Sequence, residues 1–144
     1  MLRSVRFASV FWIAVLAAAP IAAEECQADK SAVDARFNEA LEAIIAHQGF
    51  AWACAPYTGA GLAQSSTVNI EMLLRDSGLR AADATVKAGE LDAKAKKDAE
   101  LHPISSPGAK REEVIVACSQ MMDEQLQKFR LARADMIKAQ CLDE

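Results

Sequence analysis

Apolar side chains recur at intervals of three and four residues along most of this 144-residue sequence, and this spacing constrains the fold more than any other feature. Residues three or four apart share one face of an α-helix, so each such run predicts a helix with an apolar stripe. No stretch shows the sustained period-two alternation of a half-buried strand. The sequence therefore predicts an all-α protein, a small up-and-down helical bundle of three long or four shorter helices.

The first helix is expected from about residue 31 to residue 48 or beyond, with Asp29 or Ser31 capping its start. Gly49 is a plausible end, and Pro56 forbids simple continuation because it has no backbone N–H to donate. The predicted apolar stripe consists of Val33, Phe37, Ala40, Leu41, Ile44, Ile45 and Gln48.

Residues 56–66, PYTGAGLAQSS, are expected to form a linker, because proline and glycine favour turns. A second helical region follows over about residues 67–100. Its residues 76–78, Asp-Ser-Gly, mark a point of kinking or division, so one helix or two fit this region. Within it, residues 87–100 mix lysines with acids three or four positions apart, which predicts a solvated helix face.

The last helix is expected from about Pro107 to Gln140, capped by Ser106 and with Pro107 in the first helical position. Glu112 and Glu113 suit the positive end of its dipole. Its predicted core stripe consists of Ile115, Cys118, Met122, Leu126, Phe129, Met136 and Ile137.

The first 23 residues have the layout of a secretory signal. Arg3 and Arg6 form a positive head, residues 7–19 form an uncharged apolar stretch, and small residues precede Glu24. An apolar stretch of this length is shorter than the roughly 20 residues that a membrane-spanning helix needs. Cleavage is therefore expected before Glu24, with a retained membrane anchor as the alternative.

Cleavage there leaves residues 24–144 as a single helical domain. The whole chain has 16 basic and 20 acidic residues, and residues 1–23 hold two of the basic ones and no acid, so the remainder has a net charge of −6. A mildly acidic domain has little attraction for nucleic acid or for an anionic membrane surface. We therefore expect no nucleic-acid partner and no stable membrane insertion after cleavage of the signal.

Four cysteines lie beyond the signal segment: Cys26, Cys54, Cys118 and Cys141. An even number in an exported chain predicts two disulfides. If the stretches 26–54 and 118–141 are helical, each separates its own two cysteines by about 35 to 40 Å, which excludes bonding within a stretch. Parallel first and last helices give Cys26–Cys118 with Cys54–Cys141, the favoured pairing. Antiparallel helices give Cys26–Cys141 with Cys54–Cys118.

The cysteines and histidines show no pattern of redox or metal chemistry. The sequence contains no CxxC and no CxxCH, and neither His47 nor His102 belongs to an HxxxH or CxxH arrangement. The methionines are expected to fill gaps in the core instead of binding copper, because no MxM or MxxM repeat gathers them. No metal ligand and no cofactor is predicted.

Three aromatic residues, Phe50, Trp52 and Tyr57, cluster around Cys54 and Pro56. Large aromatic side chains beside a disulfide commonly close the end of a bundle. Tyrosine and tryptophan also anchor protein interfaces more often than most residues. Phe50, Trp52 and Tyr57 are therefore the predicted partner-binding residues if this end of the bundle carries a binding surface.

No residue is predicted to be catalytic. The sequence has no GxSxG and no GxGxxG, and its adjacent acids resemble solvated surface. We therefore expect a non-enzymatic protein, periplasmic or secreted, that binds an unidentified protein of the cell envelope. The main alternative is a carrier of a small ligand or metal, with an interior pocket lined by methionine and alanine. An active site assembled from residues distant in sequence is the remaining alternative.

Overall fold

The computed structural model describes residues 28–104 and 108–141, and within these ranges the chain forms four helices and no strand. The helices are α1 (Lys30–Thr58), α2 (Gly61–Asp76), α3 (Ala81–Leu101) and α4 (Arg111–Ala139). The predicted all-α class is confirmed, and of the two predicted arrangements, three long or four shorter helices, the structure has four. The predicted secretory signal, residues 1–23, lies outside the described residues.

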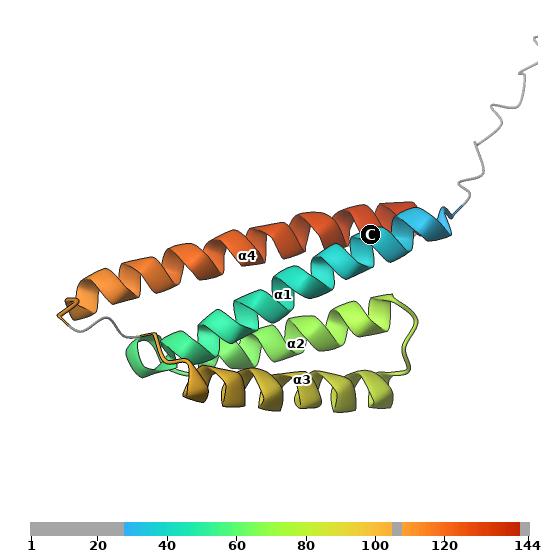
Figure 1. The fold of residues 1–144 in the computed structure, drawn as a ribbon. Coiled ribbons are helices and arrows are strands. Elements are labelled where there is room, and N and C mark those ends of the chain that lie inside the picture. The colour runs from blue at the N-terminus through green and yellow to red at the C-terminus, as the bar shows by residue number, and fades with distance from the viewer. Residues whose placement is uncertain (1–27, 105–107, 142–144) are drawn as a thin grey trace, which may run out of the picture.

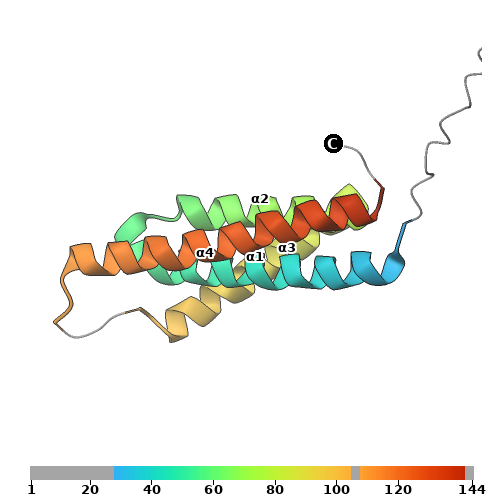
Figure 2. The same cartoon turned by 90° about the horizontal axis from the view of Figure 1, so that it is seen from above.

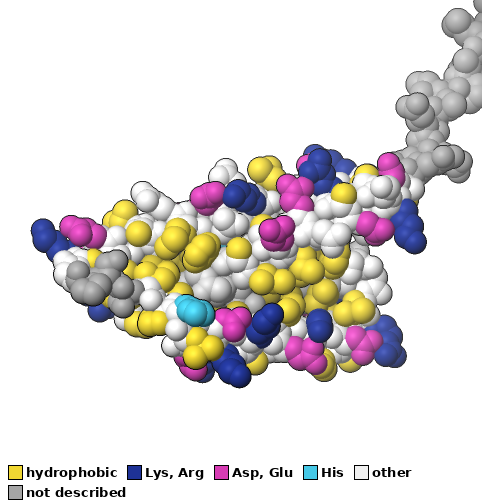
Figure 3. Space-filling model, viewed as in Figure 1, with side chains coloured by type: hydrophobic (Ala, Val, Ile, Leu, Met, Phe, Trp, Pro, Cys, Tyr) yellow, Lys and Arg dark blue, Asp and Glu magenta, His cyan; other side chains and the backbone are white. Residues whose placement is uncertain are grey.

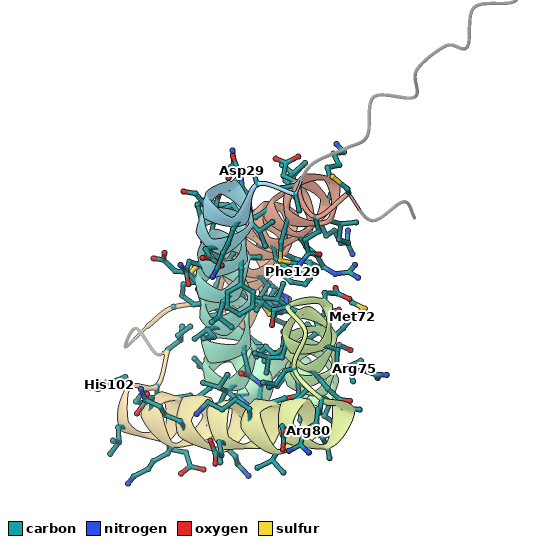
Figure 4. All side chains as sticks on the ribbon, turned by 90° about the vertical axis from the view of Figure 1, so that its right-hand side faces the viewer. Asp29, Met72, Arg75, Arg80, His102 and Phe129 are labelled. Carbon is teal, nitrogen blue, oxygen red and sulfur yellow. A yellow bond between two sulfur atoms is a disulfide. The ribbon has the colours of Figure 1, made fainter. Side chains whose placement is uncertain are left out.

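The central helix is α1, which packs against all three of the others. Helix α4 lies along one side of α1, whereas α3 lies on the opposite side and contacts both α1 and α2 (Figure 1). Seen from above, α3 runs obliquely to α1 (Figure 2). Viewed along the bundle, α3 crosses beneath the other helices from Arg80 to His102 (Figure 4). The C-terminal half of α3 therefore diverges from α1.

Helix α1 begins where it was expected and ends ten residues later than Gln48. The Asp29 carboxylate accepts hydrogen bonds from the backbone N–H groups of Ser31 and Ala32 at 3.0 and 3.2 Å, which confirms the predicted cap. The helix continues through Gly49, because packing on several sides of α1 outweighs the cost of about 1 kcal/mol that glycine carries in a helix.

The predicted linker at residues 56–66 is wrong. Pro56 lies in the last turn of α1, and only Gly59 and Ala60 separate α1 from α2. A proline in the final turn costs the helix only one backbone hydrogen bond, and the helix therefore tolerates it there. The residue that ends α1 is Gly59, whose φ of 86° favours glycine and whose N–H donates to the Ala55 carbonyl at 2.9 Å.

The division of the second helical region occurs where Asp-Ser-Gly indicated it. Helix α2 ends at Asp76, and Gly78 adopts a φ of 95°. The Leu79 N–H then donates to the Leu74 carbonyl at 3.1 Å, which closes the end of α2. The two-helix alternative for residues 67–100 is therefore correct.

This division also explains why the favoured disulfide pairing is wrong. In an up-and-down bundle, each helix runs opposite to the one before it. The first and last helices are therefore parallel in a bundle of three helices and antiparallel in a bundle of four, such as this one. The structure bonds Cys54, near the end of α1, to Cys118, near the start of α4, with an S–S distance of 2.03 Å. This bond excludes Cys26–Cys118 and Cys54–Cys141 and agrees with the antiparallel alternative.

At the opposite end of this helix pair, the Asp29 N–H donates to the Ala139 carbonyl at 3.3 Å, which brings the start of α1 beside the end of α4. None of the described cysteines is a free thiol. Cys26, the remaining partner in the predicted framework, lies outside the described residues.

Helix α4 begins at Arg111, four residues after the expected start at Pro107. Its N-cap residue, Lys110, makes no side-chain capping bond. Glu112 and Glu113 occupy the first turn, where they interact favourably with the positive end of the helix dipole. Ser106 and Pro107 lie outside the described residues.

The core consists of two clusters along α1. The larger cluster has the buried residues Ala40, Ala43, Ile44, Ile70, Leu73, Leu74, Ala84, Ala88, Phe129, Ala132 and Met136. Figure 4 shows Phe129 pointing between the helices. The smaller cluster surrounds the disulfide and has the buried residues Ala51, Cys54, Ala63, Val114, Cys118 and Met122. Among the helices of the described ranges, none combines the length and apolar character that crossing a membrane requires.

Candidate functional site

An open groove of about 380 Å³ lies where α1 and the C-terminal half of α3 diverge, and we call it the α1–α3 groove. Helix α1 supplies most of its apolar surface, and α3 and the segment after it supply the other wall. The lining residues are Ile45, Ala46, Gly49, Phe50, Ala53, Ala95, Asp98, Ala99, His102 and Ile104. Apolar side chains are exposed between α4 and α3 on this face (Figure 3).

The groove exists because both of its walls carry small side chains. Gly49 and Ala53 lie on the α1 wall and Ala95 and Ala99 on the α3 wall. A Cβ added at Gly49 would meet no atom within 4 Å, so space is open directly above the α1 backbone. Because the two helices diverge and their side chains are short, residues 28–104 and 108–141 leave this surface unfilled.

Phe50 connects the groove to a second hollow of about 420 Å³ between α1 and α4. Ala46 and Phe50 line both hollows, and Glu39 and Glu42 line only the second. The exposed apolar surface of α1 is therefore continuous past Phe50. Its apolar residues on α1 run from Ala43 to Ala53, about 15 Å along the helix axis, and Glu39 and Glu42 extend the two hollows together to about 21 Å.

Trp52 does not line the groove and lies on the next side of α1. Its indole Nε1–H donates to Asp92 Oδ1 at 2.8 Å, and the Lys96 ammonium lies 5.2 Å from the ring centroid. Trp52, Ala53 and Lys96 line a third hollow, of about 290 Å³. The indole is therefore partly buried and hydrogen-bonded to α3.

The Asp92 carboxylate joins three helices through one oxygen. Besides Trp52, its Oδ1 lies 2.9 Å from Gln48 Nε2, which donates to it, and 3.0 Å from Thr67 Oγ1. Gln48 Nε2 also donates to Thr67 Oγ1 at 2.9 Å. Hydrogen bonds to an ionised acceptor are stronger than neutral ones, so this network fixes the middle of α3 against α1 and α2.

The role of Asp92 was not predicted from the sequence, in which its neighbouring charges indicated a solvated helix face. The structure turns it toward α1, next to the partly buried Leu91 and one turn after the buried Ala88. One sequence signal pointed to this network: Gln48 was placed in the apolar stripe of the first helix, and a fully buried amide needs a polar partner.

Tyr57 lies at the far end of α1, away from the groove. The Arg111 guanidinium lies 5.7 Å from its ring centroid and donates to the Tyr57 carbonyl at 3.3 Å. All three predicted aromatic residues pack against the smaller core cluster, around the disulfide. The structure thus brings Phe50 to the groove, Trp52 to the Asp92 network and Tyr57 to the start of α4.

The two histidines occupy different surroundings. His47 is buried in α1, and its Nδ1 lies 2.6 Å from Ser66 Oγ on α2. Burial lowers the pKa of His47; Asp123 opposes this effect and Arg130 adds to it. Ser66 has no exposed surface (0%), so this serine and histidine are closed to a substrate and act as a structural link between helices.

His102 lies at the open end of the groove, directly after α3 (Figure 4). Within residues 28–104 and 108–141, no group of three or more His, Cys, Asp or Glu side chains is arranged to hold a metal ion. The groove therefore offers apolar contact, one imidazole and the Asp98 carboxylate to another molecule.

Comparison of the chain with protein-family models, with curated protein sequences and with solved structures gives no match. The function is therefore inferred from the groove, the aromatic residues around it and the charges along its edges.

Proposed function

We propose that this protein is exported, is not an enzyme, and acts in the periplasm or outside the cell by binding another protein of the cell envelope. The observation that carries the proposal is the α1–α3 groove, which is open, largely apolar, about 380 Å³ in volume and has Phe50 in its wall. Contact with a partner would remove this apolar surface from water, which is favourable by about 25 cal/mol per Å². Exposed apolar surface of this kind is typical of interaction sites.

Each predicted aromatic residue has a separate role in this proposal. Phe50 contacts the partner, because it lines both the groove and the neighbouring hollow. Trp52 positions α3 through its hydrogen bond to Asp92. Tyr57 closes the end of the bundle against Arg111.

The disulfide framework supports export. The Cys54–Cys118 bond spans 64 residues of sequence, and in the chain-entropy model such a bond stabilises the fold by about 4 kcal/mol. Disulfides of this kind persist outside the reducing cytosol. We infer that Cys26 and Cys141 form the second bond, since the start of α1 and the end of α4 meet at the Asp29–Ala139 hydrogen bond.

The proposal is tested by photocrosslinking in the cells that export the protein. A photoreactive residue replaces His102, at the open end of the groove, or Val86, which is 63% exposed near the start of α3. We expect a discrete protein adduct from position 102 and none from position 86. Adducts of equal yield at the two positions, or none at position 102, would contradict the proposal.

A matched pair of glycine variants tells groove binding from contact elsewhere. Gly49 and Gly89 both lie in helices, and an added Cβ meets nothing within 4 Å at either site. Gly49→Gln fills the groove with a good helix former, and Gly89→Gln makes the same change outside it. The adduct at position 102 should disappear in Gly49→Gln and persist in Gly89→Gln.

A small-ligand carrier is the second candidate, because the groove volume of about 380 Å³ falls within the range of small-molecule sites. The methionines do not line this groove, in contrast to the pocket expected from the sequence. Native mass spectrometry of protein purified from its own cells tests this candidate. A bound small molecule that survives desalting, together with no crosslinked protein, would favour the carrier.

A further inference from the structure

The apolar surface around the groove is long enough for nearly three turns of a helix. The α1–α3 groove and the hollow between α1 and α4 share Ala46 and Phe50, so they form one track along α1. Its full length of about 21 Å corresponds to about 14 residues of an α-helix at 1.5 Å per residue, and its apolar part, from Ala43 to Ala53, to about ten. Gly49 and Ala53 have no side chain or a short one, which allows another helix to approach the α1 backbone closely.

The backbone around the track favours a helical occupant over an extended one. Apart from the short segment after α3, the walls are α-helices, and the backbone N–H and C=O groups inside these helices are hydrogen-bonded within the helix. An extended peptide adds affinity mainly by pairing with an exposed strand edge, and the described residues contain no strand. An amphipathic helix needs only an apolar groove between side chains, which this track provides.

The charges along the track are unbalanced toward the negative. Glu42 lies on the α4 side and Asp98 on the α3 side, and neither has an ion-pair partner among the described residues. The other charged residues of the track are neutralised within the protein: Glu39 pairs with Arg36 at 2.6 Å, and Lys128 pairs with Glu124 at 2.7 Å. Figure 3 shows acidic side chains on both sides of the exposed apolar surface.

From these observations, and resting on the proposed function, we infer that the occupant of the track is an amphipathic helix of a partner protein with Lys or Arg on both sides of its apolar stripe. The apolar stripe contacts Ile45, Gly49 and Phe50. The basic residues on its two sides meet Glu42 and Asp98. Complementary charges of this kind set orientation and partner choice more than they set affinity.

The probes for this inference are three synthetic 15-residue peptides. The first has leucine at positions 1, 4, 8, 11 and 15 and lysine and alanine elsewhere, the second has glutamate in place of lysine, and the third is a scramble of the first. Binding is measured by fluorescence anisotropy on the full chain, and peptide helicity by circular dichroism. We expect the first peptide to become helical and to bind at least tenfold more tightly than the other two.

Two pairs of variants locate the site. Gly49→Gln should weaken binding of the first peptide at least tenfold, and Gly89→Gln should leave it within twofold. Asp98→Lys should weaken binding several-fold. Asp34→Lys, the same charge change at an exposed residue near the start of α1, should change binding less than twofold at 0.15 M salt. Equal weakening within either pair would overturn the inference.

This experiment and the crosslinking experiment fail in different ways. If position 102 captures a protein in cells while the glutamate peptide binds as well as the lysine peptide, the proposed function stands and the basic-helix occupant is wrong. If no peptide binds and position 102 captures nothing, both are wrong. Tight binding of the scrambled peptide would show attraction to charge alone and would also overturn the inference.

Discussion

Two of the three neighbours of helix α1, α4 on one side and α3 on the other, are held against it in different ways. Against α4 it has a disulfide and large buried side chains, including Phe129 and Met136. Against α3 it has Ala84 and Ala88, the fully buried members of that helix, together with the Asp92 network. The groove lies on the side where contact depends on small residues and a few hydrogen bonds.

The difference shows how one helix serves both as a scaffold and as a surface. Burying a large apolar side chain contributes roughly 1.5 to 3 kcal/mol, and an alanine much less. Helix α4 also reaches α2, where Arg133 pairs with Asp76 at 2.7 Å. The contacts between α1 and α4 therefore contribute much of the stability of the fold. Apolar residues between α1 and α3 can then remain exposed for a partner without a large loss of stability.

The largest expected effect comes from breaking the covalent link on the α4 side. Replacing Cys54 and Cys118 together by alanine should lower the free energy of unfolding by about 4 kcal/mol, because the unfolded chain regains the entropy of a loop of 64 residues. Urea unfolding monitored by circular dichroism measures this change. A loss below 1 kcal/mol would show that α4 is held mainly by its apolar contacts.

The second effect comes from the polar link on the α3 side. Asp92→Ala should lower the free energy of unfolding by about 2 kcal/mol, because it leaves the Trp52 indole N–H without its acceptor and removes one of the two acceptors of Gln48 Nε2. Asp98→Ala is the matched control on the same helix and should cost less than about 0.5 kcal/mol. If the two variants cost the same, the network does not hold α3.

The two glycine variants should each stabilise the protein slightly. Gly49→Gln and Gly89→Gln replace glycine in a helix by a better helix former, which is favourable by about 0.5 to 1 kcal/mol. The same urea experiment measures both. A marked destabilisation by Gly49→Gln alone would mean that the space above Gly49 is filled, contrary to the open groove.

The smallest expected effect is a pH dependence that originates at His47. Burial holds its pKa below the usual value of about 6.5, so the unfolded chain binds the proton more readily. The stability from this residue is complete above the unfolded pKa and falls as the pH drops from about 7 through 6.5 toward the lower, folded pKa. Arg130 disfavours the proton as well, whereas Asp123 partly favours it.

Urea unfolding at pH 7.5, 6.5 and 5.5 measures this dependence. His47→Gln should flatten the fall in stability over this range. His102→Gln, at an exposed histidine, should leave it unchanged. A fall that persists in His47→Gln would assign the pH dependence to other groups.

Local sequence signals predicted the features of the fold that depend on neighbouring residues. The all-α class follows from the apolar spacing, the Asp29 cap from one polar side chain, and the division of α2 from α3 from Asp76-Ser77-Gly78. The end of α1 was expected at Gly49 or somewhat beyond, and continuation through Pro56 was not expected. Gly49 and Pro56 are weak stop signals where packing against three other helices favours continuation.

Features that depend on how helices meet were harder to predict. The favoured disulfide pairing failed because it assumed three helices, and a single turn at Gly78 reverses the direction of the last one. Phe50 was identified as a candidate from its aromatic side chain and its position near Cys54 and Pro56 in the sequence. The opposite wall of the groove, with Ala99 and Asp98, depends on the oblique path of α3, which no local pattern encodes.

The most direct test of the account is to map the bound lysine–leucine peptide on the protein by the shifts of backbone amide signals in NMR. The largest shifts should fall in residues 42–53 of α1 and in residues 95–104 of α3 and the segment after it. The exposed apolar residues of α4, Val116 and Leu131, should remain unshifted. Shifts centred on Val116 or Leu131, with none around Gly49, would show that the partner binds the α4 side and would contradict the account.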